Sequence, residues 1–183
     1  MTSITQQESV SRMRSSATHL LDSSERLVSV VAPPSLVQLA LRFALAVPFW
    51  QSGILKWDGF LQLNDVAVDL FSSEFKLHLP GGPYDYPAPE VFAFVTGCAE
   101  IMLPILLVLG LATRLAASAL LLMTLVVELT VPDGWPVHAT WAAMALGVMG
   151  LGPGRLSLDA LIAWLFAGTV RPAGAGAPVR PAA

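Results

Sequence analysis

Five ionisable side chains lie within or at the edges of long apolar segments, where charge is costly. Arg42 and Glu100 lie deep in two of these segments, and Lys56, Glu128 and His138 lie near segment ends. A charged group at the centre of a bilayer costs about 2.5–3.5 kcal/mol on insertion scales, so each needs a partner or a function. These residues are therefore the first candidates for chemistry.

Arg42 and Glu100 are predicted to form a pair. If the first two apolar segments run antiparallel, the depths of the two residues differ by roughly one helical turn, within reach of an arginine side chain. One interpretation is that the ion pair fixes the packing of two helices. The other is that Glu100 carries protons or binds a polar head group, while Arg42 adjusts its proton affinity.

A second group is predicted near the outer surface. Glu128 and His138 flank a short connection and can face each other, while Lys56 and Glu90 lie at a similar depth. In this pocket His138 would exchange protons near neutral pH, Glu128 would orient it, and Lys56 would hold an anionic or carbonyl group. Taken singly, each residue is also explained as a snorkelling or interfacial side chain. The candidate ligand-binding residues are Lys56, Glu90, Trp57 and Trp141.

Metal chemistry has little support in the sequence. The histidines, at 19, 78 and 138, fall in separate segments, so we expect neither haem nor zinc. Cys98 and Met102 are one turn apart, a spacing that suits soft copper(I) ligands, although methionine on an apolar helix is usually a packing residue. The single cysteine excludes dithiol chemistry.

The composition excludes two broad classes of protein. Of the 183 residues, 55% are apolar and only 13% are charged, which argues against a soluble domain. The formal net charge is −3, so there is no basic excess for binding a phosphate backbone, and nucleic acid is not expected as a partner.

Four apolar segments are long enough to position these residues across a membrane. Backbone groups in lipid must be paired within the segment, so we predict helices. The fold class is therefore all-α, an integral membrane four-helix bundle. The predicted spans are 35–57, 90–111, 115–131 and 135–151.

Two further stretches are predicted to be surface helices. Apolar residues recur at three- and four-residue steps over 60–77, which predicts an amphipathic helix in the outer loop, and again after Ser157, which predicts an interfacial helix. We interpret 1–34 as a partly disordered cytoplasmic tail, 35–168 as the membrane domain and 169–183 as a disordered tail. Basic residues number seven on the side of the termini and two opposite, so we expect both termini in the cytoplasm.

The order of several motifs resembles the DoxX family of small bacterial membrane proteins. The resemblance covers roughly residues 36–166. It rests on Arg42, Gly53–Lys56, Gly97–Glu100, Gly110–Arg114 and Gly152–Asp159. It implies a four-helix bundle in the bacterial inner (plasma) membrane, related to membrane subunits associated with a thiosulfate:quinone oxidoreductase.

The leading functional expectation is therefore a membrane subunit or partner of a redox system. The resemblance allows a quinone as cofactor, and the expected partners are the lipid bilayer and another subunit or a second copy. The alternative is a noncatalytic scaffold or lipid-binding protein, and a third interpretation is metal or small-solute handling. Whether the chain is an enzyme stays open.

Overall fold

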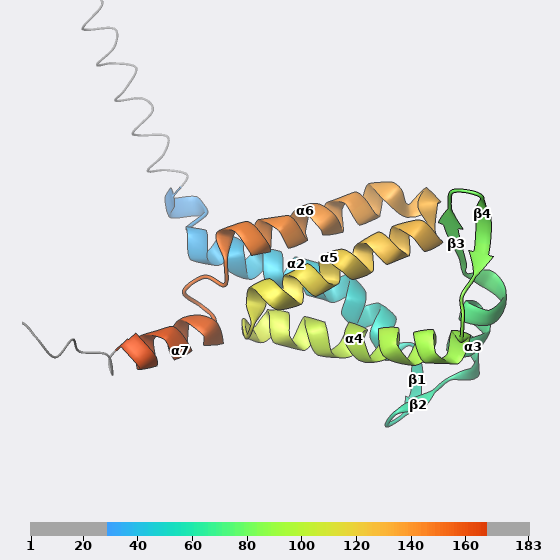
Figure 1. Cartoon of the computed structure of the whole chain (residues 1–183). Coiled ribbons are helices and arrows are strands. Elements are labelled where there is room, and N and C mark those ends of the chain that lie inside the picture. The colour runs from blue at the N-terminus through green and yellow to red at the C-terminus, as the bar shows by residue number, and fades with distance from the viewer. Residues whose placement is uncertain (1–28, 168–183) are drawn as a thin grey trace, which may run out of the picture.

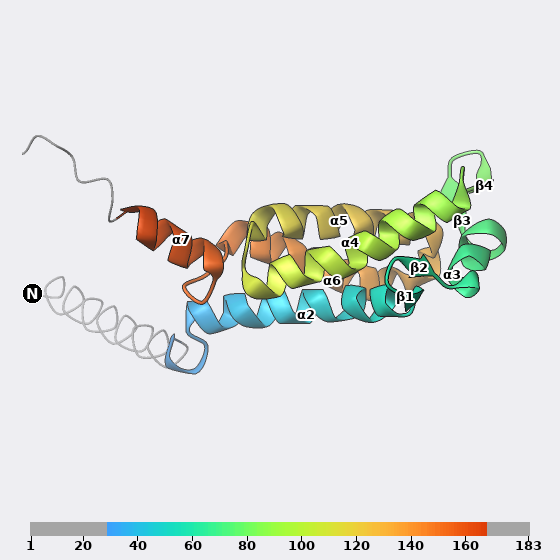
Figure 2. The ribbon, with the colours of Figure 1, turned by 90° about the horizontal axis from the view of Figure 1, so that it is seen from below.

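Four long helices lie side by side in the computed structural model, which describes residues 29–167 (Figures 1 and 2). They are α2 (Pro34–Ile54), α4 (Pro89–Leu109), α5 (Thr113–Thr130) and α6 (Trp135–Leu151). Helix α2 contacts α4 and α6, and α5 also contacts α4 and α6, so the contacts close a ring. Most of the predicted N-terminal tail and all of the predicted C-terminal tail lie outside the described residues.

The core of this ring receives side chains from all four helices. Phe49 of α2, Leu107 of α4, Leu120 of α5 and Val148 of α6 are all buried there. Small residues such as Ala117 lie between them and let the helices approach closely.

Two of the four helices are long and apolar enough to cross a membrane by length and composition alone. These are α4 and α5. Helix α2 is as long as α4, with 21 residues, but it contains Arg42, and α6 has 17 residues. The prediction of four membrane spans therefore goes beyond what these criteria show.

The prediction of one continuous helix over 60–77 is wrong at both ends. The segment begins in a hairpin, continues as a short helix and a π-helical turn, and ends in a second hairpin, all gathered at one end of the molecule (Figure 1). We call this the hairpin end. Its elements are β1 (Trp57–Gly59), β2 (Gln62–Leu63), α3 (Asp65–Asp69), η1 (Leu70–Glu74), β3 (Lys76–Leu79) and β4 (Gly82–Asp85).

Local backbone chemistry explains where the helical part begins and ends. Leu61 has a φ of 56°, a left-handed conformation that turns β1 into β2. Asn64 then caps α3 by accepting a hydrogen bond from the backbone N–H of Ala67 at 2.7 Å. The predicted inward face is kept only in the helical part, where Ala67 and Phe71 are buried, whereas Phe60 is 92% exposed.

A terminal helix lies at the opposite end, as the sequence predicted. Helix α7 (Leu158–Ala167) begins after Ser157, whose hydroxyl accepts a hydrogen bond from the N–H of Ala160 at 3.1 Å. None of its residues is buried, and it extends away from the ring of helices (Figures 1 and 2). We call this the α7 end.

Candidate functional site

A buried ion pair lies where α2 ends beside α4. The Nζ of Lys56 donates to Oε2 of Glu100 at 2.5 Å and to the hydroxyl of Ser52 at 2.9 Å. Ser52 in turn donates to the other carboxylate oxygen of Glu100 at 3.2 Å. The side chains of Lys56 and Glu100 are only 13% and 8% exposed. The three groups form a closed polar cluster, which we call the Lys56 cluster.

Two glycines bring this cluster together. A Cβ on Gly53 would lie 2.9 Å from the Cβ of Glu100, so only glycine permits this approach of α2 to α4. On α4, Gly97 lies under the indole of Trp57 in the same way, since a Cβ there would lie 2.8 Å from the ring. Ser52 and Lys56 are one helical turn apart and face the same side. The sequence therefore encodes the pair through glycines at the helix crossing.

The Lys56 cluster lines a cavity of about 280 Å³ whose other walls are almost wholly apolar. Aromatic side chains from the hairpin end and from α4 form one wall, and α5 forms another. The aromatic residues are Phe71, Phe75, Tyr86 and Phe92. The α5 wall and the residue after it supply Met123, Val126, Val127, Thr130 and Val131. The cavity is thus a mostly apolar space with one lysine, one carboxylate and four hydroxyl-bearing residues, which are Ser52, Tyr86, Thr96 and Thr130.

A hydrogen bond joins the cover of this cavity to α5. The hydroxyl of Thr130 donates to the carbonyl of Val126 at 2.8 Å, so its contact of 2.5 Å with the Tyr86 hydroxyl has tyrosine as the donor. Nearby, Nδ1 of His78 lies 3.2 Å from the carbonyl oxygen of Leu129. Both contacts hold the hairpin end against α5.

The predicted pairing of Arg42 with Glu100 is wrong. Arg42 is fully buried and donates instead to the carbonyl oxygen of Leu156, at the α7 end. The prediction assumed that the end of α2 and the start of α4 lie at the same depth. In the structure α4 begins beyond the end of α2, towards the hairpin end. Glu100 of α4 lies beside Gly53 of α2. Gly53 follows Arg42 by eleven residues, which is about 16 Å along α2.

Arg42 belongs to a second cluster, formed by the motifs around residues 110–114 and 152–159. Asp159 accepts hydrogen bonds from the N–H of Ala112 at 2.8 Å and from the N–H and hydroxyl of Thr113 at 2.9 and 2.8 Å. Ala112 cannot cap α5 with its own side chain, so Asp159 supplies the cap from α7. Gly110 has a φ of 70° and faces the Arg42 guanidinium.

The electrostatics of Asp159 follow from these contacts. Burial by itself raises the pKa of this carboxyl. The hydrogen bonds from Thr113 and Ala112, together with the positive charge of Arg42, outweigh burial and hold the pKa of Asp159 below its ordinary value. The carboxylate form therefore stabilises the folded protein.

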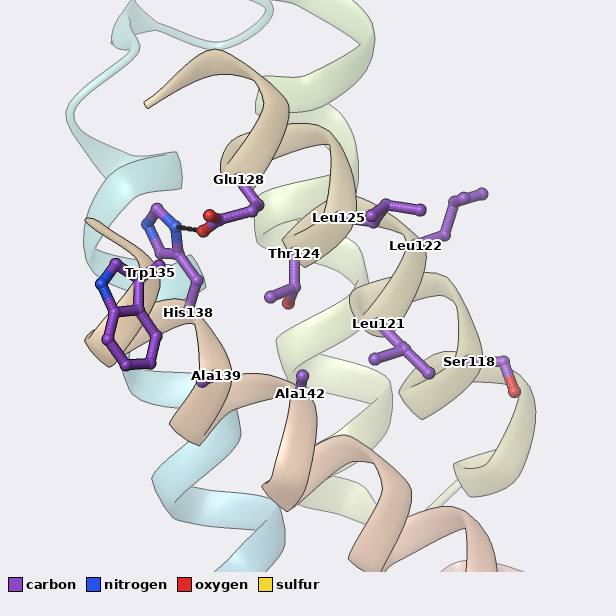
Figure 3. Close-up of a pocket in the computed structure, with 10 residues that line it drawn as sticks. All are labelled: Ser118, Leu121, Leu122, Thr124, Leu125, Glu128, Trp135, His138, Ala139 and Ala142. Carbon is purple, nitrogen blue, oxygen red and sulfur yellow. Dashed lines mark hydrogen bonds and ion pairs between the residues drawn. The ribbon is translucent and has the colours of Figure 1, made fainter. Parts of the chain in front are cut away.

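Glu128 and His138 meet as the sequence suggested, but Lys56 is not with them. The Oε2 of Glu128 lies 2.7 Å from Nδ1 of His138. They line a separate groove of about 580 Å³ between α5 and α6 (Figure 3). The predicted outer pocket is therefore divided between two cavities, with Lys56 in one and His138 in the other.

The remaining candidates lie outside the Lys56 cavity. Glu90 is exposed beside Asp65 and Asp69 of α3. Trp57 contacts Phe94 edge-on, and Trp141 packs against Phe49 and His138.

The copper candidates receive no support from neighbouring ligands. Cys98 is half-buried and Met102 is 61% exposed. Within residues 29–167, no three His, Cys, Asp or Glu side chains come close enough to hold a metal ion.

Several residues of these sites were not predicted from the sequence. Ser52 precedes Lys56 by one turn, and this spacing was a usable signal. Tyr86 and Thr130 come together only because the hairpin end packs against α5. No local sequence pattern predicts this contact. Asp159 stood in a recognised motif, but its partner Thr113 is 46 residues away.

A protein-family model identifies the family of this chain. The DoxX model matches residues 37–133, more than half of the chain. The chain belongs to the DoxX family. DoxX proteins are membrane proteins, so the surroundings of this one are a lipid bilayer.

One relative among curated proteins is itself without an assigned role. It is an uncharacterized protein of Haemophilus influenzae, 29% identical over 133 residues, which cover 68% of this chain and 82% of the relative. No solved structure matches the chain. The DoxX motifs named above fall into two clusters in space: Gly53, Lys56 and Glu100 near the hairpin end, and Arg42, Gly110 and Asp159 at the α7 end.

Proposed function

We propose that this DoxX protein binds the head of a neutral, carbonyl-bearing lipid-soluble molecule of the quinone class in the Lys56 cavity. The observation that carries the proposal is the position of the Lys56–Glu100 pair on the wall of an otherwise apolar, aromatic cavity. In this role the protein serves as a membrane subunit or partner of a redox system, beside another subunit or a second copy.

The residues suit such a head group. An ammonium has three N–H donors, and Glu100 and the Ser52 hydroxyl engage two of them. The remaining donor has only the carbonyl of Ser52, at 3.5 Å, so it is available to a ligand carbonyl. The rings of Phe71 and Phe92 supply apolar contact for a planar ring. A bound quinone supplies two-electron, two-proton redox chemistry.

Charge and size restrict the ligand further. Glu100 neutralises Lys56, so the cavity has no net positive charge to attract a phosphate or a carboxylate. Its volume, about 280 Å³, lies just below the usual range for small-molecule pockets. A single substituted ring fits this description better than a phospholipid.

The placement in the membrane is part of the proposal. We infer that α2, α4, α5 and α6 all span the inner membrane of a bacterium, with both termini in the cytoplasm. Exposed Arg114 and Arg155 lie at the α7 end, which supports assigning that end to the cytoplasmic side. The hairpin end and the Lys56 cavity then lie towards the outer surface.

A second role, as a packing device, is favoured for Arg42. Its guanidinium is fully buried, and it contacts the carbonyl of Leu156 in the segment that leads to α7. None of the cavities described above is lined by Arg42. We therefore assign a structural role to Arg42 and ligand binding to Lys56 and Glu100.

Co-purification tests the proposal. The full chain is expressed in its membrane, isolated in lipid nanodiscs formed directly from that membrane, and extracted for quinones by mass spectrometry. We expect quinone per protein well above its bulk ratio to lipid in the wild type, and the bulk ratio in Lys56→Met. Lys76→Met, in the exposed pair with Asp85, is the matched control and should retain the wild-type ratio. Equal ratios in wild type and Lys56→Met would overturn the proposal.

A further inference from the structure

The groove between α5 and α6 differs from the Lys56 cavity in being open to the surroundings of the molecule. Its walls include Leu121, Ala139 and Ala142, and its volume is about 580 Å³ (Figure 3). Leu122 and Leu125 are 63% and 55% exposed, so the groove opens away from the core of the ring. In a membrane this side faces lipid.

One end of the groove is polar, and its polar side chains are held in fixed positions. The His138 side chain is only 9% exposed, and its ring packs against Trp141 and over Gly134, where a Cβ would lie 2.7 Å from Nε2. Glu128 lies on α5, two residues before the end of the helix, and its Oε2 lies 2.7 Å from Nδ1 of His138. The ring of His138 is thus fixed in position by its packing and by this hydrogen bond.

The donors and acceptors of the Glu128–His138 pair that have no partner determine which ligand head group fits beside it. A carboxylate only accepts, so Nδ1 of His138 carries the proton of the shared hydrogen bond, and Nε2 is an acceptor when the ring is in its neutral form. Neither Nε2 nor the second oxygen of Glu128 has a hydrogen-bond partner among residues 29–167. The indole N–H of the exposed Trp135 is a donor at this end of the groove, but with the ring neutral the Glu128–His138 pair itself presents two acceptors and lacks a donor. A hydroxyl supplies that donor, whereas a phosphate or carboxylate adds acceptors and negative charge beside Glu128.

The rest of the groove suits an apolar chain. From Glu128 to Ser118 it follows α5 for ten residues, or about 15 Å, between leucine and alanine side chains. Burying such a chain against these walls is favourable only if the head is also satisfied, because an unpaired polar head in an apolar site is costly.

We propose that this groove is a second binding site, for a neutral amphiphile with a hydroxyl head, such as a prenyl alcohol or an alkyl phenol. The hydroxyl donates to the Glu128–His138 pair, and the tail lies along α5. This site is independent of the Lys56 cavity and of the proposed function, because the two are lined by different residues.

Photo-crosslinking tests the site with defined probes. The full chain in nanodiscs is irradiated with a farnesol analogue that has a diazirine on its tail, and labelled peptides are identified by mass spectrometry. We expect saturable labelling within residues 118–142, competed by farnesol but not by farnesyl methyl ether or farnesyl phosphate. Glu128→Gln should reduce labelling about tenfold, while Lys76→Met leaves it unchanged.

A second variant keeps the test decisive if the polar pair is needed for folding. Leu125→Trp places a large side chain in the groove while keeping Glu128 and His138 themselves, and it should abolish the labelling. Competition by the methyl ether equal to that by farnesol would overturn the proposed role of the pair. Competition by farnesyl phosphate would instead identify a general lipid groove and overturn the proposed selectivity. Loss of wild-type labelling when two copies share a nanodisc would show that a second copy covers the groove, which also contradicts the proposal.

Discussion

At the scale of single residues, the polar groups of this protein act in pairs whose members lie on different helices. Lys56 is neutralised by Glu100, and His138 is oriented by Glu128. A buried ion pair adds little net stability compared with two apolar residues, because both charges must be desolvated. Removing one member is different, since it leaves the other charge unpaired in an apolar cavity. The pair around Lys56 is therefore better explained by ligand binding than by stability.

The first prediction concerns the coupling of this pair. Lys56→Met and Glu100→Gln should each lower the free energy of unfolding in detergent by about 3 kcal/mol, and the double variant should lose much less than the sum. Lys76→Met removes a pair exposed to solvent and should cost less than about 1 kcal/mol. Chemical unfolding monitored by circular dichroism measures all four. Additive losses in the double variant would show that the two charges do not interact.

The second prediction concerns the glycine at the crossing of α2 and α4. Gly53→Ala should destabilise the protein by about 1–3 kcal/mol, because the new Cβ would lie 2.9 Å from the Cβ of Glu100 and the helices must separate. Gly150→Ala is the matched control. No atom lies within 4 Å of a Cβ at that position, so the change should be neutral or stabilise the helix by up to about 1 kcal/mol. Equal effects of the two changes in thermal unfolding would contradict the close crossing.

At the scale of elements, the long helices could be predicted from hydropathy, but their register could not. The segments predicted at 35–57 and 90–111 correspond closely to α2 and α4. Pairing Arg42 with Glu100 required their relative depth, which is set by glycines that meet across the interface. The segment 60–77 failed for a related reason. Its apolar spacing fits a helix, but the turn at Leu61 and the extended backbone at Phe75 interrupt it.

The third prediction concerns the link between α7 and α5. Asp159→Asn should lower stability at pH 7 by about 1 kcal/mol, because it removes the charged cap of α5. The pKa of Asp159 is lower in the folded than in the unfolded protein, so this contribution is present above about pH 4 and is lost as the pH falls through the folded value.

The measurement is the difference in unfolding free energy between wild type and Asp159→Asn across pH. It should be constant between about pH 5 and 8 and should shrink below about pH 4. A difference that grows on acidification would contradict the hydrogen bonding described for Asp159. Asp69→Asn, on the exposed surface of α3, is the control and should show no such trend.

At the scale of the whole molecule, the two clusters of family motifs lie at opposite ends and have different roles. The α7 end joins α2, α5 and α7 through Arg42 and Asp159, whereas the hairpin end covers the Lys56 cavity. The DoxX family and the residues of both clusters could be recognised from the sequence. Which residues share a cluster could not, because Lys56 and Glu100 meet across 44 residues of chain.

The fourth prediction is the orientation of these two ends in the membrane. In a Cys98→Ala background, a cysteine at Ser73 should react with an impermeant thiol reagent in intact cells, and a cysteine at Ala177 should react only after the membrane is opened. The physical reason is the excess of arginine on the side of the termini. The reverse pattern of labelling would contradict the cytoplasmic position of the termini.

The most direct test of the proposed binding site is the infrared spectrum of a bound quinone. A short-chain ubiquinone with ¹³C-labelled carbonyls is added to the protein in nanodiscs, and its C=O band is compared between wild type, Lys56→Met and the control Lys76→Met. We expect a band shifted to lower frequency by the Lys56 hydrogen bond in wild type and in Lys76→Met, and a band at the frequency of quinone in lipid in Lys56→Met. The same band in Lys56→Met as in wild type would contradict binding of the carbonyl at Lys56.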